Sequence, residues 1–280
     1  MPRPLPRRGK PRFTARTADR HELYQLSVQA PERDARFLSR YVQKTTGKPL
    51  RRFREDFCGT ALLACWFVKL HRDNHAVGVD LHWPTLAWGR IHNVARLLDR
   101  DQQQRLRLLR ADVCRVRTPR VQAIAALNFS YSVLPTRQAL RRYFDACWHA
   151  LEPGGLLFVD AWGGPDVQAH KTDRTRHRGF DYLWEQRAFD PITHRIECAI
   201  HFEFRDGTRL MDAFVYDWRL WTMPELRELM ADAGFTDVHV LWEGTDRATH
   251  TGNGVFRRKE VGDADPAWIV YVVGRRPARR

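Results

Sequence analysis

The chain has 280 residues, of which 43% are hydrophobic and 11% aromatic, and its 47 basic and 33 acidic residues give a formal net charge of +14. This composition excludes a disordered, a collagenous or a disulfide-stapled protein. The charge gathers at the ends: residues 1–20 hold seven basic side chains and one acid, and residues 274–280 hold four basic side chains and no acid. Such ends either bind phosphates or keep the chain soluble, and both interpretations stay open.

The five cysteines form no C-x-x-C pair and have no metal-finger spacing, which indicates reduced thiols and predicts a cytoplasmic protein without a metal site. The longest apolar run, over residues 61–68, is too short to cross a membrane. The prolines within the first eleven residues would break the amphipathic helix of a mitochondrial presequence. We therefore expect no membrane partner.

In chain order, residues 1–20 are expected to form a basic, disordered tail, and residues 21–48 a helical lid that Pro31 divides into two segments. Residues 49–164 then alternate between short apolar runs and helix-length segments. The predicted strands are 52–57, 76–79, 106–109, 123–127 and 156–159, and the predicted helices between them are 60–70, 84–98 and 137–151. This alternation favours a parallel sheet with helices on both faces, which binds its ligands at the carboxyl ends of the strands.

The pattern changes to antiparallel strands in residues 165–221. The predicted strands there are 181–188, 194–205 and 209–220, and Asp206-Gly207 is a hairpin signal between the last two. This segment is expected to be an insert that covers the site.

Residues 222–273 complete the core. Thr222 and Glu225 form a capping box that starts a helix ending at Gly234, and strands 238–242 and 268–273 flank a polar loop that contains Asn253-Gly254. Residues 274–280 are a second basic tail. The predicted fold is α/β: a doubly wound, Rossmann-like, seven-stranded and mostly parallel sheet with an antiparallel β insert after the fifth strand.

Polar residues end four successive predicted strands of the core. The first strand, which contains Glu55, runs into a small-residue turn at Gly59 that lets the backbone approach a ligand closely. The second ends about twenty residues on at Asp80, a position from which a carboxylate can accept both hydroxyls of a ribose. The third ends at Asp112 and the fourth at Asn128. Each acid alone could be a helix cap, but the ordered set favours a functional site.

These motifs resemble those of class I S-adenosylmethionine-dependent methyltransferases. The first motif of that family is typically an acid, a hydrophobic residue and G-x-G-x-G. Glu55 and Gly59 match this frame, whereas Phe57 and Ala61 stand where the family usually has glycine. The E-P-G-G sequence at 152–155, before an apolar strand ending in Asp160, is also typical. R-E-D-F-C-G-T at 54–60 and N-F-S-Y at 128–131 resemble a bacterial-type subgroup, which implies no substrate.

The resemblance implies S-adenosyl-L-methionine as the cofactor and methyl transfer as the activity. It puts Glu55 near the methionine part, Asp80 on the ribose, and Asp112 with Val113 on the adenine. Tyr24 could close over the cofactor, although a packed amphipathic helix explains it as well. The predicted cofactor residues are Tyr24, Glu55, Cys58, Gly59, Thr60, Asp80, Leu81, Asp112, Val113, Asn128 and Phe129.

Methyl transfer from a sulfonium is an in-line displacement, so the protein must align the acceptor and exclude water. The aromatic residues of the insert could enclose a small acceptor, or they could pack the insert onto the core. The predicted pocket residues are Tyr131, Trp162, Tyr182, Trp184 and Arg219, and the candidate catalytic residues are Tyr131, Asp217 and Arg219.

Three functions remain. The single insert with its aromatic lining favours a methyltransferase with a small-molecule acceptor. The basic ends and the partial likeness of N-F-S-Y to the N-P-P-Y motif favour an RNA or DNA methyltransferase. Phe57 in the cofactor turn is the support for a non-catalytic S-adenosylmethionine-binding protein. Asp160 either belongs to the site or caps the loop that follows it.

Overall fold

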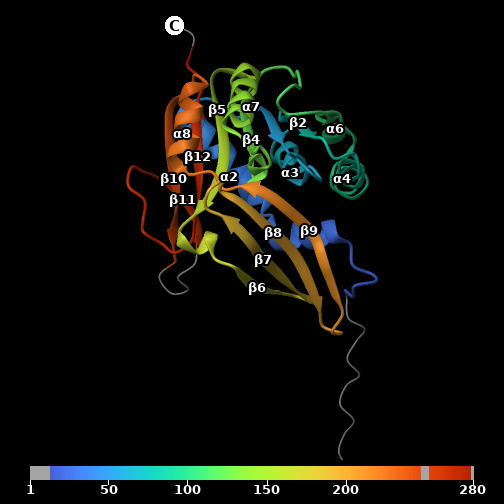
Figure 1. Cartoon of the computed structure of the whole chain (residues 1–280). Coiled ribbons are helices and arrows are strands. Elements are labelled where there is room, and N and C mark those ends of the chain that lie inside the picture. The colour runs from blue at the N-terminus through green and yellow to red at the C-terminus, as the bar shows by residue number, and fades with distance from the viewer. Residues whose placement is uncertain (1–12, 247–251, 279–280) are drawn as a thin grey trace, which may run out of the picture. The chain divides into compact units, whose positions relative to one another are not determined.

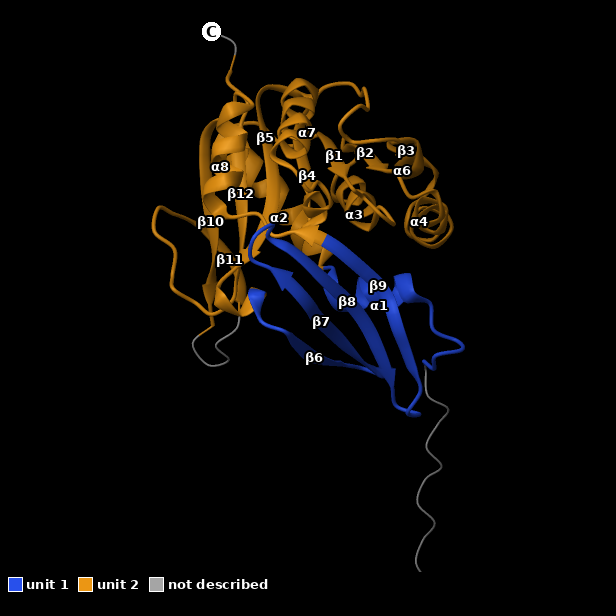
Figure 2. Cartoon of the chain, viewed as in Figure 1, with its two compact units in different colours: residues 1–29, 168–217 blue, residues 30–167, 218–280 orange. Residues whose placement is uncertain are grey.

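The structure is a computed structural model that describes residues 13–246 and 252–278, coloured along the chain in Figure 1. The chain forms two compact units (Figure 2): residues up to 29 with residues 168–217 make unit 1, and residues 30–167 with 218–280 make unit 2. Each unit has a sheet of its own. The segment 21–48, which we expected to be one lid, is divided between the units after Gln29.

Unit 2 contains an eight-stranded sheet with the order β11-β10-β12-β5-β4-β1-β2-β3. Its strands are β1 (Arg52–Asp56), β2 (His75–Asp80), β3 (Leu106–Arg110), β4 (Val121–Ala126), β5 (Leu151–Gly163), β10 (Thr236–Thr245), β11 (Gly252–Lys259) and β12 (Trp268–Arg275). The first five are parallel, and the last three are antiparallel to their neighbours. The mostly parallel α/β sheet is confirmed. The expected count of seven strands is wrong, because the expected loop around Asn253 pairs with β10 as β11.

Helices cover both faces of this sheet. They are α2 (Pro31–Thr46), α3 (Leu62–Leu70), α4 (Trp83–Gly89), α5 (Ala95–Leu97), α6 (Arg100–Gln104), α7 (Arg137–Ala150) and α8 (Met223–Asp232), with a π-helical segment η1 (Arg90–Val94) between α4 and α5. Successive strand residues point to opposite faces. Phe53 and Phe158 therefore pack in one apolar cluster with α2 and α3, whereas Ile124 and Leu157 pack in another with α7 and α8.

A buried ion pair lies at the end of β1, on the side of α7. Nε of Arg54 lies 2.8 Å from Oδ1 of Asp56, and both side chains are fully buried. The hydroxyl of Tyr143, from α7, donates to Oδ2 of Asp56 at 3.1 Å. Removing one charge would leave the other buried without a partner, at a cost of about 3–5 kcal/mol. The pair therefore fixes the last residues of β1 before the chain turns.

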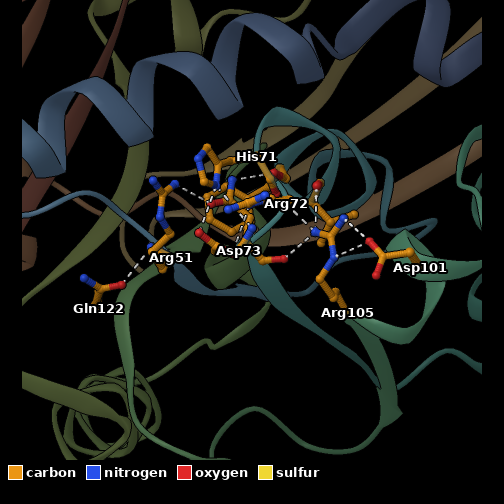
Figure 3. Close-up of polar contacts among 10 residues, drawn as sticks. Arg51, His71, Arg72, Asp73, Asp101, Arg105 and Gln122 are labelled. Atoms are coloured by element: carbon orange, nitrogen blue, oxygen red, sulfur yellow. Dashed lines mark hydrogen bonds and ion pairs between the residues drawn. The ribbon is translucent and has the colours of Figure 1, made fainter.

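The opposite edge of the sheet, where the strands begin, is held by a network around Arg105 (Figure 3). Nη1 of Arg105 donates to the carbonyls of Val68, His71 and Asn74, at 2.9, 3.2 and 2.7 Å. These carbonyls lie at the end of α3 and in the turn after it, where helix carbonyls lack partners of their own. Arg105 therefore ties the end of α3 to the edge of the sheet where the strands begin.

Unit 1 is a four-stranded antiparallel sheet with the order β6-β7-β8-β9. Its strands are β6 (Lys171–His177), β7 (Phe180–Asp190), β8 (Arg195–Phe204) and β9 (Arg209–Arg219), and its helix is α1 (Arg20–Val28), which Asp19 caps. Leu23 of α1 and Phe202 of β8 are buried in its core. The hairpin expected at Asp206-Gly207 joins β8 to β9, and β6 is a strand that we did not predict.

Parts of both expected tails are ordered. Phe13 packs edge-to-face on Phe180 at 5.6 Å, so residues 13–20 belong to unit 1. The guanidinium of Arg276 is largely buried and donates to the carbonyls of Trp148 and Leu151. The rest of the expected tails, residues 1–12 and 279–280, lies outside the described residues.

Two further expectations concern cysteines and membranes. None of the five cysteines, all of them in the described ranges, forms a disulfide. In residues 13–246 and 252–278 there is no helix with the length and apolar character to span a bilayer.

Candidate functional site

The turn between β1 and α3 has an unusual backbone. Phe57, Gly59 and Ala61 have φ values of 54°, 53° and 57°, all in the left-handed region. These are the three positions of the G-x-G-x-G frame, although two of them carry a Cβ. The left-handed conformation costs roughly 1–2 kcal/mol at a residue that is not glycine. All three positions of the turn thus have left-handed backbone although two of them are not glycine, and neighbouring groups must stabilise this conformation.

Contacts from two other segments hold the turn. The N–H of Cys58 donates to the carbonyl of Val79 in β2 at 3.0 Å, and Nδ2 of Asn93 donates to the carbonyl of Thr60 at 2.9 Å. Gly89 allows this approach, because a Cβ there would lie 2.3 Å from the same carbonyl oxygen. Asn93 is part of the π-helical segment, a feature that often marks functional sites. The sequence did not predict Gly89 or Asn93, since a π turn leaves no periodic signal.

Asp80 lies at the carboxyl end of β2 and meets the turn. Its Oδ2 accepts the N–H of Gly59 at 2.7 Å, and its Oδ1 accepts the N–H of His82 at 2.7 Å. A carboxylate oxygen can accept two hydrogen bonds, so each oxygen of Asp80 can also accept a hydroxyl. Leu81 exposes its apolar side chain directly beside Asp80.

Asp112 follows the third strand. Its Oδ1 accepts the N–H of Cys114 at 2.8 Å, and Nε of Arg115 lies 3.6 Å from Oδ2. Val113, the next residue, is buried in the cluster on the side of α7. The structure therefore places Asp80 and Asp112 at the ends of adjacent strands. Their assignment to a ribose and a base stays a prediction.

Glu55 is buried on the side of α3. Its Oε2 accepts the N–H of Ala64 at 2.9 Å, which caps the start of α3. Burial raises the pKa of Glu55 to about 8, and the charge of Asp80 adds to the shift. Burial likewise raises the pKa of the Cys58 thiol well above its ordinary value, which disfavours the thiolate form.

A carboxylate that we did not predict joins this group. Asp34, in the first turn of α2, is mostly buried, and burial raises its pKa to about 6. Its negative charge also contributes to the raised pKa values of Glu55 and Asp160. Asp34 is far from both in the sequence, and an acid in the first turn of a helix is common, so no sequence signal could have identified it.

The end of β4 carries an aromatic cluster. The ring of Phe129 stacks on that of Trp162 at 5.5 Å and 25°, and it meets Trp218 edge-to-face at 6.4 Å. Asn128 precedes Phe129, and the carboxylate of Asp160 accepts the N–H groups of both residues. The structure therefore brings the predicted pocket residue Trp162 together with the predicted cofactor residues Asn128 and Phe129.

The candidate catalytic residues differ in their surroundings. Tyr131 is buried, and burial followed by the charge of Asp160 raises the pKa of its phenol well above the ordinary value, which suits a hydrogen-bond donor. Nη2 of Arg219 contacts Oε1 of Glu225 at 2.8 Å, and its guanidinium lies over Trp221 at 4.0 Å.

The remaining predicted site residues belong to unit 1. The ion pair with Arg195 holds the pKa of Asp217 below its ordinary value, which weakens it as a base. The ring of Tyr24 lies 5.1 Å from that of Phe214, and burial raises the pKa of Tyr182. Nε1 of Trp184 donates to Gln186 at 3.3 Å. A role for Tyr24, Tyr182 and Trp184 in a ligand site stays a prediction.

The groups at the carboxyl edge of unit 2 fit S-adenosylmethionine. Asp80 offers acceptors for a diol, and a Cβ added at Gly59 would meet Thr85 in ordinary van der Waals contact, 3.8 Å from its Cγ2. Glu55, Asp34 and Asp160 place three carboxyl groups on this side of the sheet, and a cationic ligand would favour their ionised forms. The cofactor carries a positive sulfur and an ammonium group, which such carboxylates attract.

No protein-family model matches the sequence, and no curated protein matches it. Among solved structures, an S-adenosylmethionine-dependent methyltransferase from Clostridium acetobutylicum is 14% identical, with a TM-score of 0.68 over 92% of this chain and 98% of that one. An amino pentose methyltransferase from Micromonospora echinaspora, with S-adenosylmethionine bound, is 17% identical (TM-score 0.63, 91% and 95% covered). A sugar N-methyltransferase from a Streptoalloteichus species is 19% identical (TM-score 0.60, 99% of both chains). The chain thus has the fold of S-adenosylmethionine-dependent methyltransferases.

Proposed function

We propose that the chain is an S-adenosylmethionine-dependent methyltransferase that acts on a small-molecule acceptor. The observation that carries this proposal is the turn at 57–61, where left-handed backbone at Phe57, Gly59 and Ala61 joins a hydrogen bond from Gly59 to Asp80. S-adenosylmethionine supplies a methyl group bonded to a positively charged sulfur. A nucleophile that attacks the methyl carbon displaces this sulfur. The role of the chain is to bind, orient and desolvate the reactants.

Different residues at the carboxyl edge would bind different parts of the cofactor. Asp80 would accept the ribose hydroxyls, and Asp112 with Val113 would hold the adenine. Glu55 and Asp34 would stabilise the positive charge of the cofactor, and that charge would in turn favour their ionised forms.

The aromatic cluster of Phe129, Trp162 and Trp218 supports a small acceptor. Its rings could hold an apolar or cationic group by their faces. Two structural neighbours are an amino pentose methyltransferase and a sugar N-methyltransferase. The protonated phenol of Tyr131 could orient an acceptor by donating a hydrogen bond.

Cofactor binding can be tested at Asp80. We expect Asp80→Ala to weaken S-adenosylmethionine binding by about 30-fold or more, or about 2 kcal/mol, because it removes a charged acceptor and the bond to Gly59. Isothermal titration calorimetry with the cofactor and with S-adenosylhomocysteine measures this. Asp232→Ala, on the exposed side of α8, is the matched control and should bind as the parent does. Equal affinity of parent and Asp80→Ala, or no binding by the parent, would contradict the proposal.

The acceptor class needs a second experiment. S-adenosylmethionine with a tritiated methyl group is incubated with the protein and either a metabolite extract or bulk tRNA. We expect label on a small molecule other than the unreacted S-adenosylmethionine. Label in the tRNA would overturn the small-molecule acceptor in favour of a nucleic acid. Binding without transfer to any fraction would support a non-catalytic binding protein.

A further inference from the structure

The turn that follows β4 has two left-handed residues in a row. Asn128 and Phe129 have φ values of 58° and 59°, and both carry a side chain. L-residues other than glycine adopt this region rarely, and two in succession persist only where other groups hold them in place. The turn therefore needs a partner that stabilises its backbone.

Asp160 of β5 is that partner. Its Oδ2 accepts the N–H of Asn128 at 2.6 Å, and its Oδ1 accepts the N–H of Phe129 at 2.8 Å. Both oxygens of one carboxylate are thus bound to successive backbone groups of the same turn. The side chain is nearly buried, with 8% exposed, so water does not compete strongly for these bonds.

The same strand also fixes the side chain of Phe129. Trp162 lies two residues after Asp160, so both side chains leave β5 on the same face. The ring of Phe129 stacks on that of Trp162, at 5.5 Å and 25°, and is nearly perpendicular to that of Trp218, at 80°. Two side chains of β5 therefore hold the turn: the carboxylate of Asp160 binds the backbone of the turn, and the ring of Trp162 packs on the ring of Phe129.

We propose that Asp160 is a positioning residue, which sets the backbone at Asn128 and Phe129 and so presents the end of β4 to the cofactor and the acceptor. The proposal rests on the proposed function, because it assigns the turn to that site. Asp160 would act through these two residues without contacting the reacting atoms. This distinguishes it from a cap of the loop that follows β5.

The charge state of Asp160 should control this contact. Burial raises its pKa to about 7, although the N–H groups of Phe129 and Asn128 favour the ionised form. Asp34 of α2, Tyr131 and Tyr271 of β12 also interact electrostatically with it. A protonated carboxyl group turns one acceptor oxygen into a hydroxyl and weakens one of the two bonds. The turn is therefore held most firmly above about pH 7.

The test is Asp160→Asn, which keeps the size of the side chain but points an NH₂ group at one of the two N–H donors. We expect the amide of Asn128 or Phe129 to exchange its hydrogen at least tenfold faster at pH 8, with the rest of β4 unchanged. We also expect at least fivefold weaker binding of S-adenosylhomocysteine by calorimetry. Asp145→Asn, on α7, is the matched control and should change neither quantity.

A further measurement separates positioning from a general loss of stability. In the unaltered protein, protection of amides 128 and 129, corrected for the intrinsic exchange rate, should rise between pH 6 and pH 8. This arm does not depend on the folding of any variant.

Wild-type protection at both amides in Asp160→Asn, unchanged affinity, or protection lost evenly along β4 would each overturn the inference. Failure of the unaltered protein to bind S-adenosylhomocysteine would instead contradict the proposed function. The exchange data would then still decide whether Asp160 holds the turn.

Discussion

Three carboxyl groups lie on one side of the sheet of unit 2, Glu55 and Asp160 buried and Asp34 mostly buried, and their ionisation depends on pH. Burial raises the pKa of Asp34 to about 6, of Asp160 to about 7 and of Glu55 to about 8. Near neutral pH these groups are therefore only partly ionised. A cationic ligand favours their ionised forms, so its binding should release protons.

The ionisation of Glu55 should make the free energy of unfolding depend on pH. Its pKa in the folded protein is raised from 4.5 to about 8, so between these values the folded state binds more protons than the unfolded state. The contribution of Glu55 to stability is then complete below about pH 4.5 and is lost as the pH rises through about 8. We expect Glu55→Gln, which cannot ionise, to gain about 2–4 kcal/mol of unfolding free energy over the parent between pH 5 and pH 9.

Urea denaturation at a series of pH values measures this difference. Glu228→Gln, on the exposed side of α8, is the matched control, and its offset from the parent should stay constant. A difference between Glu55→Gln and the parent that is independent of pH would show that Glu55 is ionised in the folded protein throughout the range.

Among the elements, the sequence predicted those whose signals are local. The break between two helices at Pro31 and the capping box at Thr222 are set by neighbouring residues, and both are present. The strand β11 was missed because Asn253-Gly254 is a turn signal that pairing with β10 overrides. The strand β6 was missed because it is an edge strand of mostly polar and charged residues, a composition that protects an edge from aggregation.

The turn between β1 and α3 allows a test of its strained backbone. Ala61 has a φ of 57°, so Ala61→Gly should relieve the left-handed strain and leave the unfolding free energy unchanged or raised by up to about 1 kcal/mol. Ala64→Gly, inside α3, is the control and should lower it by about 1 kcal/mol or more. Thermal and urea denaturation compare the two variants. A larger loss for Ala61→Gly than for Ala64→Gly would show that the turn is not strained.

For the whole molecule, the sequence predicted the half of the candidate site that lies along consecutive strand ends. Asp80 and Asp112 follow directly from the order of strands in a parallel sheet. Asp34 and the role of Asp160 depend on contacts between segments more than thirty residues apart, which no local pattern encodes. The placement of polar side chains at strand ends can thus be predicted, whereas contacts between distant segments require the structure.

The net charge of the molecule bears on the remaining question of a nucleic acid partner. Deleting residues 1–12 and 279–280 removes seven basic and no acidic side chains, and lowers the formal net charge from +14 to +7. Because each phosphate contact releases counterions, we expect the deletion to weaken tRNA binding and to reduce the slope of log K against log salt by up to about 5. S-adenosylmethionine binding should be unaffected, since Asp80, Asp112 and Glu55 all lie in unit 2. An unchanged salt slope would show that tRNA binds to residues 13–278 and not to the deleted ends. A nucleic acid acceptor would then have to be recognised by those residues.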